Sequence, residues 1–320
     1  MELRNFGSLG HVSALTLGGG GIAGVWGGTD RSEAVATVHA ALDSGVTMLD
    51  LAPSYGTGFE SEYAVAEALR LRPAPDVMIT SKVQLPDDDG RDFAARIRRS
   101  LHDSLRRLGR DHLDVFLLHT QFRRAGQTLP GTVDPAGYRD EIVPTFESLR
   151  GEGRIRAWGV TAVGDPVPLT DALSASPRPD AAQIVVNALD QSGDLWIHGD
   201  TVRPDNAALI RAAGDAGVAV IGIRVVAAGS LTSALDRQVP PTHPAAIDFA
   251  RARPFRDLAA ELGESPAALA HRYALSVPGV ATVVLGVKNR TELAECLAAE
   301  ARGPLTDAEL KAVAGLRPAA

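Results

Sequence analysis

Cysteine and long apolar runs are nearly absent from this chain of 320 residues. Its single cysteine, Cys296, cannot form an intrachain disulfide, and so low a cysteine content is typical of a reducing compartment. No run approaches the roughly 18 consecutive apolar residues of a transmembrane helix, and the opening MELRNFGSLG lacks the basic and then apolar pattern of a signal peptide. Together these absences predict a soluble cytoplasmic protein with no membrane partner.

Concentrated positive charge and aromatic residues are also scarce. The chain has 39 acidic against 32 basic residues, a net charge of −7 at pH 7. Because binding to nucleic-acid phosphates needs a concentrated positive surface, this balance argues against a nucleic-acid partner. The histidines are scattered without the spacing of metal ligands, so we predict no metal site. Aromatic residues make up 5% of the chain, which is compatible with both a wide mixed pocket and a tight apolar one.

Short apolar runs rich in β-branched residues recur along the whole chain. They are continuously apolar, as expected of strands buried on both faces of a parallel sheet. The predicted strands are Ala14–Leu17, Thr47–Leu51, Val77–Ser81, Val115–Leu118, Arg156–Val160, Ala182–Val186, Val218–Ile223 and Ala281–Leu285.

Amphipathic segments lie between these strands. The predicted helices are Ser32–Ser44, Glu60–Leu71, Phe93–Leu108, Asp140–Glu152, Pro204–Ala216, Ser265–Val277 and Thr291–Ala299, several with a Ser or Thr cap. Eight strands alternating with helices predict one α/β domain over residues 1–320, a (β/α)₈ TIM barrel. The segment Leu3–Val12 is predicted to form a hairpin closing the barrel bottom. Three long irregular stretches follow strands and are placed on the C-terminal face, namely Gln121–Ala136, Ala188–Arg203 and Gly229–His243.

A glycine run offers a competing interpretation. Gly19–Gly24 matches G-x-G-x-x-G after a predicted strand, but that pattern marks a dinucleotide-binding Rossmann fold only if a helix opens inside it. The residues that follow, Val25–Asp30, are poor helix formers. We therefore predict a flexible rim loop here, with Trp26 as a wall of the substrate pocket, and the Rossmann fold stays as an alternative.

Polar side chains end three successive strands of the predicted barrel. Asp50, Lys82 and His119 occupy these ends, and Tyr55 lies in the loop after Asp50. The phenol of a tyrosine has a pKa of about 10, which a buried lysine ammonium would lower while the aspartate balances the lysine charge. A histidine can donate to a carbonyl oxygen from the other side. The set therefore predicts proton transfer, with Tyr55 as the donor to a carbonyl oxygen.

These strand ends carry a specific resemblance. Met48–Gly56 (MLDLAPSYG), Ile79–Val83 (ITSKV), Asp114–His119 (DVFLLH) and Gly153–Thr161 (GRIRAWGVT) resemble the aldo-keto reductase family, and the likeness continues along the chain. In that family the residues matching Asp50, Tyr55, Lys82 and His119 form the catalytic tetrad. The resemblance therefore implies exchange of a hydride between a nicotinamide cofactor and a carbonyl or alcohol.

The same resemblance implies which residues hold the cofactor. Thr161 and Gln183 would bind the nicotinamide carboxamide, and the end of strand 8 would clamp the adenosine phosphate. The full implied set is Thr161, Gln183, Ile223, Arg224, Gly229, Leu231, Gly286, Lys288, Asn289 and Glu292. The expected substrate contacts come from the tetrad and from aromatic residues of the rim loops, and they are Trp26, Tyr55, His119 and Phe122. A further aromatic residue of the rim loops, Trp196, is also expected to shape the pocket.

The chain departs from the family pattern at several of these positions. Ala162 removes an amide after strand 5, Ile223 replaces an aromatic residue, and Glu292 and Cys296 replace a common Gln and Asn. Lys288 favours NADP(H) because its family counterpart faces the 2′-phosphate, whereas the carboxylate of Glu292 keeps NAD(H) possible.

We therefore predict an NADP(H)-dependent oxidoreductase acting on a small-molecule aldehyde, ketone or alcohol. A non-catalytic cofactor-binding regulatory or subunit protein of the same fold is the alternative. A metal- or phosphate-dependent barrel lyase stays open as a third possibility, because fold does not imply function.

Overall fold

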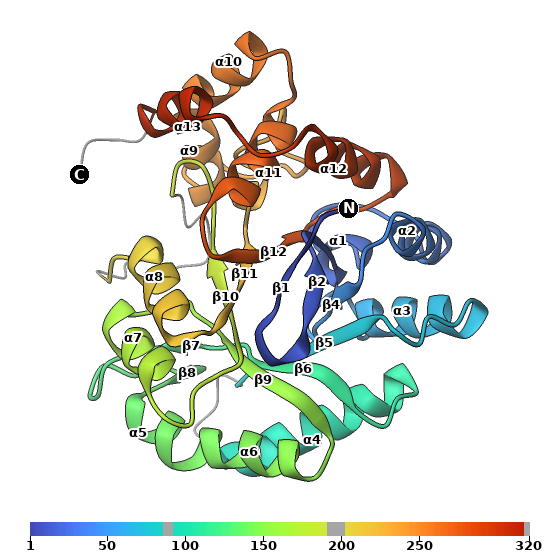
Figure 1. Cartoon of the computed structure of the whole chain (residues 1–320), viewed down its shortest axis with the longest axis vertical. Helices are drawn as coiled ribbons and strands as arrows, with labels where there is room; N and C mark the ends of the chain where they lie inside the picture. Colours follow the sequence, from blue (N-terminus) through green and yellow to red (C-terminus); the bar gives the residue numbers. More distant parts are fainter. Residues whose placement is uncertain (86–91, 191–201, 317–320) are drawn as a thin grey trace.

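Eight parallel strands close into a barrel in the computed structural model, which describes residues 1–85, 92–190 and 202–316 (Figure 1). The strands are β3 (Leu15–Gly18), β4 (Met48–Asp50), β5 (Met78–Val83), β6 (Leu113–Leu118), β9 (Ile155–Thr161), β10 (Ala181–Val185), β11 (Ala219–Ile223) and β12 (Val280–Leu285). Their order around the barrel is their order in the chain, and β12 pairs back with β3. The predicted (β/α)₈ fold is confirmed, and the closed barrel rules out the Rossmann alternative.

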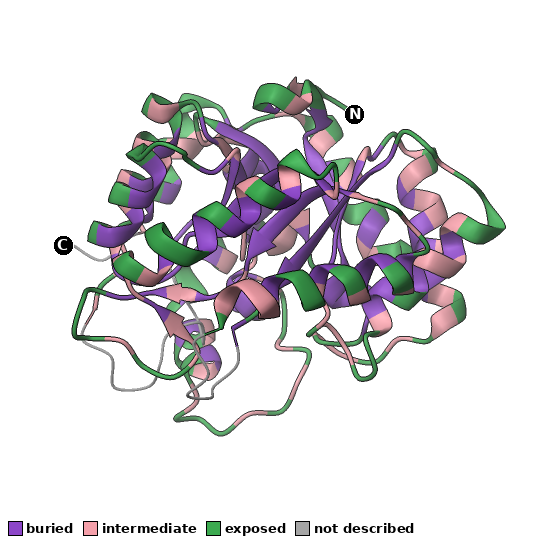
Figure 2. Ribbon diagram, turned by 90° about the horizontal axis from the view of Figure 1, so that it is seen from below, coloured by how far each residue is buried: buried purple, intermediate pink, exposed green. Residues whose placement is uncertain are grey.

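Helices surround the barrel and turn one apolar face toward the strands (Figure 2). The ring consists of α2 (Arg31–Asp43), α3 (Glu60–Leu71), α4 (Phe93–Leu108), α6 (Val143–Gly151), α7 (Pro166–Ser174), α8 (Asn206–Ala216), α11 (Pro266–Ser276) and α12 (Arg290–Arg302). Shorter or peripheral elements are α1 (Gly19–Ile22), α5 (Pro135–Gly137), a π-helical turn (Tyr138–Ile142), α9 (Pro244–Arg251), α10 (Arg253–Glu261), α13 (Asp307–Ala314) and the 3₁₀ turns Gly7–Leu9 and Ala227–Gly229. The bounds of α3 and α4 agree with the sequence prediction, whereas α7, α9, α10 and α13 were not predicted.

Some predicted helix starts are displaced. α2 and α12 are capped by Asp30 and Asn289 rather than by Ser32 and Thr291. Each cap oxygen accepts a hydrogen bond from a backbone amide in the first turn, which would otherwise lack a partner. Pro204 lies before α8 instead of inside its first turn. A carboxylate or amide just outside the helix therefore decided these boundaries.

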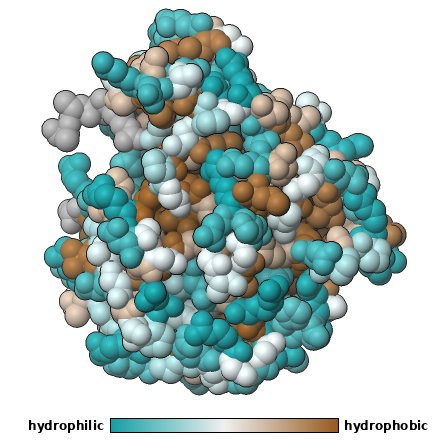
Figure 3. Space-filling model, viewed as in Figure 1, coloured by the Kyte–Doolittle hydropathy of each residue, from teal (hydrophilic) through white to brown (hydrophobic). Residues whose placement is uncertain are grey.

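An N-terminal hairpin covers the bottom of the barrel interior. The hairpin of β1 (Leu3–Asn5) and β2 (His11–Ser13) pairs antiparallel. Its residues Phe6 and Val12 are buried in one cluster with Met48 and Met78, which begin β4 and β5. The predicted hairpin closure of the bottom is thus confirmed, and the hairpin crosses the middle of the barrel in Figure 1. On this same face most of the rim is hydrophilic, and hydrophobic residues show through toward the middle (Figure 3).

The glycine run after β3 has a packing role. Gly19–Ile22 forms the short helix α1, so the expectation of a wholly irregular loop was wrong for these four residues. A Cβ on Gly21 would lie 2.0 Å from the carbonyl oxygen of Val287. Only glycine allows the chain after β3 to approach the chain after β12 this closely.

Two of the predicted irregular stretches can be followed on the C-terminal face. The first carries the paired two-residue strands β7 (Gln121–Phe122) and β8 (Thr132–Val133). The stretch Gly229–His243 is irregular beyond the 3₁₀ turn that ends at Gly229. Most of Ala188–Arg203 lies outside the described residues. Within the described part of the chain, no helix has both the length and the apolar character needed to cross a bilayer.

Aromatic rings fix helix α6 to the outside of the barrel. The ring of Phe146 on α6 stacks on Trp158 of β9, with centroids 5.4 Å apart, and meets Phe116 of β6 edge-on at 5.7 Å. All three side chains are fully buried. Stacked and edge-on rings of this kind add stability beyond the area that they bury.

We predict that Phe146→Ala lowers the free energy of unfolding by about 3–5 kcal/mol, because it leaves a cavity between α6 and two strands. Chemical denaturation measures the change. Val167→Ala, at a half-exposed position, serves as the control and should change it by about 0.5 kcal/mol or less. A loss below about 1 kcal/mol in Phe146→Ala would contradict the docking of α6 described above.

Candidate active site

A buried ion pair lies at the C-terminal end of the barrel interior. Lys82 Nζ of β5 is 2.8 Å from Asp50 Oδ2 of β4 and donates a second hydrogen bond, 2.7 Å long, to the carbonyl oxygen of Leu51. The Lys82 and Asp50 side chains are 0% and 3% exposed. Two buried charges are stable only when they are paired and hydrogen-bonded. This geometry therefore holds the ammonium at one fixed point.

A hydrogen-bonded row continues from this pair across the barrel. Gln183 Nε2 of β10 donates to Asp50 Oδ1 at 2.8 Å, and Thr161 Oγ1 of β9 donates to Gln183 Oε1 at 3.3 Å. All three side chains are buried. Four strands thus place Thr161, Gln183, Asp50 and Lys82 in one connected row, although these residues are far apart in the sequence.

Tyr55 lies next to Lys82, and His119 lies next to Tyr55. The Tyr55 ring centroid is 4.7 Å from Lys82 Nζ, and the His119 ring meets the Tyr55 ring edge-on with centroids 6.0 Å apart. Gly56 makes the turn after Tyr55 with φ +77°, where a Cβ would lie 2.6 Å from the carbonyl oxygen of Ala23. The structure therefore brings all four residues of the predicted tetrad together.

The environment of the tetrad sets its protonation. Burial raises the pKa of Tyr55 above that of a free phenol; the charge of Lys82 opposes this shift and that of Asp50 adds to it. The expected lowering by Lys82 is thus present but smaller than the effect of burial. Burial by itself lowers the pKa of Lys82, but Asp50 and Tyr55 outweigh it, so the pKa is raised and Lys82 stays charged. Tyr55 is consequently a neutral phenol at neutral pH.

His119 is held neutral. Burial, together with the positive charges of Lys82 and Arg224, lowers its pKa to about 3. Its backbone amide donates to the Val83 carbonyl oxygen at 2.7 Å, which fixes the end of β6. Among the described residues its Nδ1 atom is buried without a hydrogen-bond partner. A buried polar atom left in this state is suited to a ligand.

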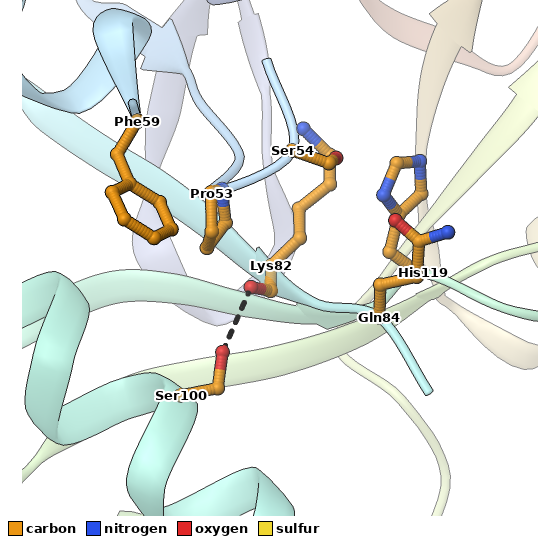
Figure 4. A pocket seen from close by; sticks show the side chains of 7 residues that line it. All are labelled: Pro53, Ser54, Phe59, Lys82, Gln84, Ser100 and His119. Carbon is orange, nitrogen blue, oxygen red and sulfur yellow. Dashed lines mark hydrogen bonds between the residues drawn. The ribbon is translucent and has the colours of Figure 1, made fainter. Parts of the chain in front are cut away.

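A cavity of about 230 Å³ opens beside the tetrad (Figure 4). Figure 4 shows the Phe59 ring on one side of it and His119 and Gln84 on the other. The complete lining is Pro53, Ser54, Phe59, Lys82, Gln84, Ser100 and His119. The cavity thus reaches from His119 and Lys82 to the start of α3 and the side of α4.

The predicted contacts around strand β11 have unusual backbone conformations. Ile223 ends β11 and packs on the barrel-interior cluster. Arg224, Ala227 and Ala228 adopt φ values of 56°, 46° and 55°. Such strain in residues other than glycine concentrates at functional sites. Leu231, further along, is fully buried.

Trp26 lies beside this strained segment. Arg224 and Arg237 place their guanidinium carbons 5.1 and 5.8 Å from the Trp26 ring centroid. A Cβ on Gly286 would be 3.6 Å from the indole. Trp26 does not line the cavity of Figure 4, so the structure connects it with the predicted cofactor residues instead of the predicted substrate pocket.

The predicted anion site after β12 is rich in carboxylates. Lys288 Nζ is 2.7 Å from Glu292 Oε1 and 3.3 Å from Asp236 Oδ2. The Lys288 backbone amide donates to Glu292 Oε2 at 2.9 Å, and Asn289 caps α12. Arg290 is paired with Glu33, at 2.9 Å. Both cations of this segment are therefore already matched by acidic side chains.

Phe122 does not lie in the cavity, although it is predicted as a substrate contact. It is fully buried in the outer core, and its ring meets Tyr138 edge-on with centroids 4.9 Å apart. Its backbone bonds to Val163 and Asp165 hold β7 against the chain after β9. This pairing turns the side chain into the core, so Phe122 does not reach the cavity. Trp196 lies outside the described residues.

Several residues of the site were missed in the sequence. Phe59, Gln84 and Ser100 line the cavity, and Asp236 and Glu33 neutralise the cations after β12. These five stand in loops or on helix faces and follow no spacing rule. In the described ranges, no group of three or more His, Cys, Asp or Glu side chains could hold a metal ion.

The chain matches the model of the Aldo/keto reductase family over residues 14–318 and belongs to this family. It is therefore an oxidoreductase of the class that acts on carbonyl or alcohol groups with nicotinamide cofactors. L-galactose dehydrogenase of Arabidopsis thaliana is 27% identical over 305 residues, 93% of this chain and 88% of that protein.

Two further relatives match about half of the chain. Aldo-keto reductase YhdN of Bacillus subtilis (strain 168) is 33% identical over 157 residues, which are 47% of this chain and 44% of that protein. The NADH-specific methylglyoxal reductase of Escherichia coli (strain K12) is 30% identical over 169 residues, 48% of this chain and 49% of that protein.

Two solved structures share the fold over the full length. The glycerol dehydrogenase AKR11B4 from Gluconobacter oxydans has a TM-score of 0.71 and 25% identity, covering 98% of this chain and 94% of that one. The holo form of aldo-keto reductase AKR11C1 from Bacillus halodurans has a TM-score of 0.75 and 24% identity, covering 100% and 97%.

We predict that His119 does not titrate between pH 5 and 8, because its lowered pKa keeps the imidazole neutral above about pH 4. Nuclear magnetic resonance of histidine-labelled protein measures the titration. Arg224→Asn removes one of the two nearby cations but tolerates the positive φ, so the pKa of His119 should move upward. A titration midpoint near pH 6.5 in the unmodified protein would contradict the neutral state.

Proposed function

We propose that the chain interconverts a carbonyl compound and its alcohol, with Tyr55 as the proton donor in the reductive direction. The observation that carries this proposal is the neutral phenol of Tyr55 beside the fixed ammonium of Lys82 and the neutral imidazole of His119. A carbonyl oxygen bound between the Tyr55 hydroxyl and His119 would receive a hydrogen bond from each. As negative charge develops on that oxygen, Tyr55 transfers its proton and Lys82 stabilises the resulting phenolate.

The residues of the barrel fit a nicotinamide at this point. When bound, the cofactor supplies or accepts the hydride. Thr161 and Gln183 are the side chains that would bind its carboxamide, and Gln183 is already oriented by Asp50. Asp50 would also hold Lys82 in place during the reaction. His119 Nδ1, buried without a partner among the described residues, gives the substrate side a polar atom to bind.

The outer end of the cofactor site favours NAD(H) over the NADP(H) expected from Lys288. A 2′-phosphate near Lys288 would have to displace Glu292 and Asp236, which stand 2.7 and 3.3 Å from its ammonium. Two carboxylates beside a phosphate repel it, whereas a carboxylate can accept a hydrogen bond from a ribose hydroxyl. The relative named as an NADH-specific methylglyoxal reductase is consistent with this preference. We therefore propose NAD(H) as the preferred cofactor.

The relatives and the cavity support a proposal for the substrate class. One relative is named for L-galactose, and a neighbouring structure for glycerol. Both compounds carry several hydroxyl groups, which would suit the partly polar lining of the cavity. We propose a small hydroxylated carbonyl compound or its alcohol as substrate, in a cytoplasmic setting.

Replacing Tyr55 with Phe should lower kcat by about 10²- to 10⁴-fold while leaving cofactor affinity nearly unchanged, because only the transferable proton is lost. Cofactor absorbance reports turnover, and fluorescence titration reports cofactor binding. Tyr63→Phe, which removes the hydroxyl of an exposed tyrosine on α3, is the matched control. Retention of most activity in Tyr55→Phe would rule out Tyr55 as the proton donor.

Replacing Glu292 with Gln should raise kcat/KM for NADPH relative to NADH by about five- to tenfold, since one negative charge beside Lys288 is removed. Steady-state kinetics with both cofactors at a fixed substrate concentration measure the ratio. Glu295→Gln removes a charge from an exposed position of the same helix and should leave the ratio unchanged. The proposed preference is incorrect if the unmodified protein uses NADPH more efficiently than NADH.

A further inference from the structure

We propose that Phe59 determines substrate specificity, as the aromatic wall of a side pocket that takes the hydroxylated chain of an uncharged carbonyl substrate. This inference rests on the proposed function, since the pocket is the cavity that extends from His119 (Figure 4). The substrate carbon chain beyond the reacting carbonyl would lie between Phe59 and Gln84, beside Ser100.

The first observation is the conformation of Phe59. Its backbone is left-handed, with φ 65° and ψ 35°, at the residue before α3. A bulky side chain rarely adopts this conformation because it is strained. The residue as a whole is nevertheless 44% exposed, so it gains little from burial in the core. A strained and exposed aromatic residue at the mouth of a cavity is better suited to contact with a ligand than to stabilising the fold.

The second observation is that a buried network holds this exposed ring. The guanidinium carbon of Arg107 on α4 lies 4.2 Å from the Phe59 ring centroid. Arg107 is in turn ion-paired with Glu62, whose side chain is 0% exposed. Ser81 Oγ of β5 donates to the other oxygen of Glu62 at 2.7 Å. Two helices and one barrel strand therefore fix the position of a ring that faces solvent.

Three other residues of the lining carry neutral polar groups. The exposed amide of Gln84 can both donate and accept hydrogen bonds. Ser100 Oγ makes a long hydrogen bond, 3.4 Å, to the Lys82 carbonyl oxygen and keeps capacity to accept others. Ser54 adds another hydroxyl at the rim. An aromatic wall facing several neutral hydrogen-bonding groups matches a chain that has C–H bonds on one side and hydroxyl groups on the other.

The charges of the lining indicate an uncharged ligand. Of the seven lining residues, Lys82 carries the only full charge at neutral pH, and Asp50 together with the Leu51 carbonyl oxygen binds its ammonium. None of these seven described residues therefore presents a free ion that could bind a carboxylate or a phosphate on the substrate. The volume of about 230 Å³ corresponds to roughly seven water molecules, which is enough for a chain of a few hydroxylated carbons.

Four-carbon aldehydes test this assignment directly. Erythrose and butanal have the same chain length and differ in their hydroxyl groups, whereas methylglyoxal is one carbon shorter and carries no hydroxyl group. In Phe59→Ala, kcat/KM should fall by about tenfold for erythrose and by less than about twofold for methylglyoxal, because remote contacts contribute only for substrates that reach them. In Gln84→Ala, it should fall for erythrose and not for butanal.

Tyr63→Ala is the matched control, since Tyr63 is a similarly exposed aromatic residue, 42% accessible, that does not line the cavity. It should leave all three values unchanged. Equal losses for erythrose and methylglyoxal in Phe59→Ala, or no loss for either, would overturn the assignment. The same holds if the unmodified protein shows no preference for erythrose over butanal.

Failure of the proposed function would give different kinetic results from failure of the pocket assignment. In that case the unmodified protein would reduce none of the three aldehydes, or Tyr55→Phe would reduce them as fast as the unmodified protein does. Turnover of methylglyoxal that depends on Tyr55 but not on Phe59 would retain the proposed function and overturn only the pocket assignment.

Discussion

The ion pair of Asp50 and Lys82 is the interaction on which the rest of the site depends. It places a full positive charge inside the barrel, where burial would otherwise favour a neutral amine. That charge partly offsets the effect of burial on the pKa of Tyr55 and adds to the effect of burial that keeps His119 neutral. The buried pair is stable because the Leu51 carbonyl oxygen accepts a further hydrogen bond from Lys82 and the Gln183 amide donates one to Asp50. Loss of either partner would leave an uncompensated charge among apolar strands.

Sequence reasoning predicted the parts of this molecule that periodicity and strand ends encode. The eight strands, the hairpin and the meeting of Asp50, Tyr55, Lys82 and His119 follow from a parallel barrel whose strands all end on one face. The sequence predicts Phe122 in the pocket because it is an aromatic residue in a long stretch read as a rim loop. The short pairing of β7 with β8 turns it into the core instead, and two-residue strands leave no pattern in a sequence.

Ion pairs between residues that are far apart in the sequence could not be predicted either. The place of Lys288 before α12 and its family counterpart predict a phosphate ligand, and Glu292 departs from the family pattern. The contribution of Asp236, 52 residues away from Lys288, depends on how an irregular loop folds over the rim. The cofactor end of the site was therefore less predictable than the chemical end, because loops supply its charges and strands supply the tetrad.

Strand β5 carries the ammonium of the reaction centre on one face and the support of the Phe59 wall on the other. Lys82 faces the barrel interior, while its neighbour Ser81 faces outward and holds Glu62. Successive residues of a strand alternate between its two faces, so a shift of one residue exchanges every side chain between them. A single insertion or deletion inside β5 would therefore remove the ammonium from the reaction centre and the support from the Phe59 wall in one event. A change in the length of a rim loop would leave this register intact, whereas a change in the length of β5 would not.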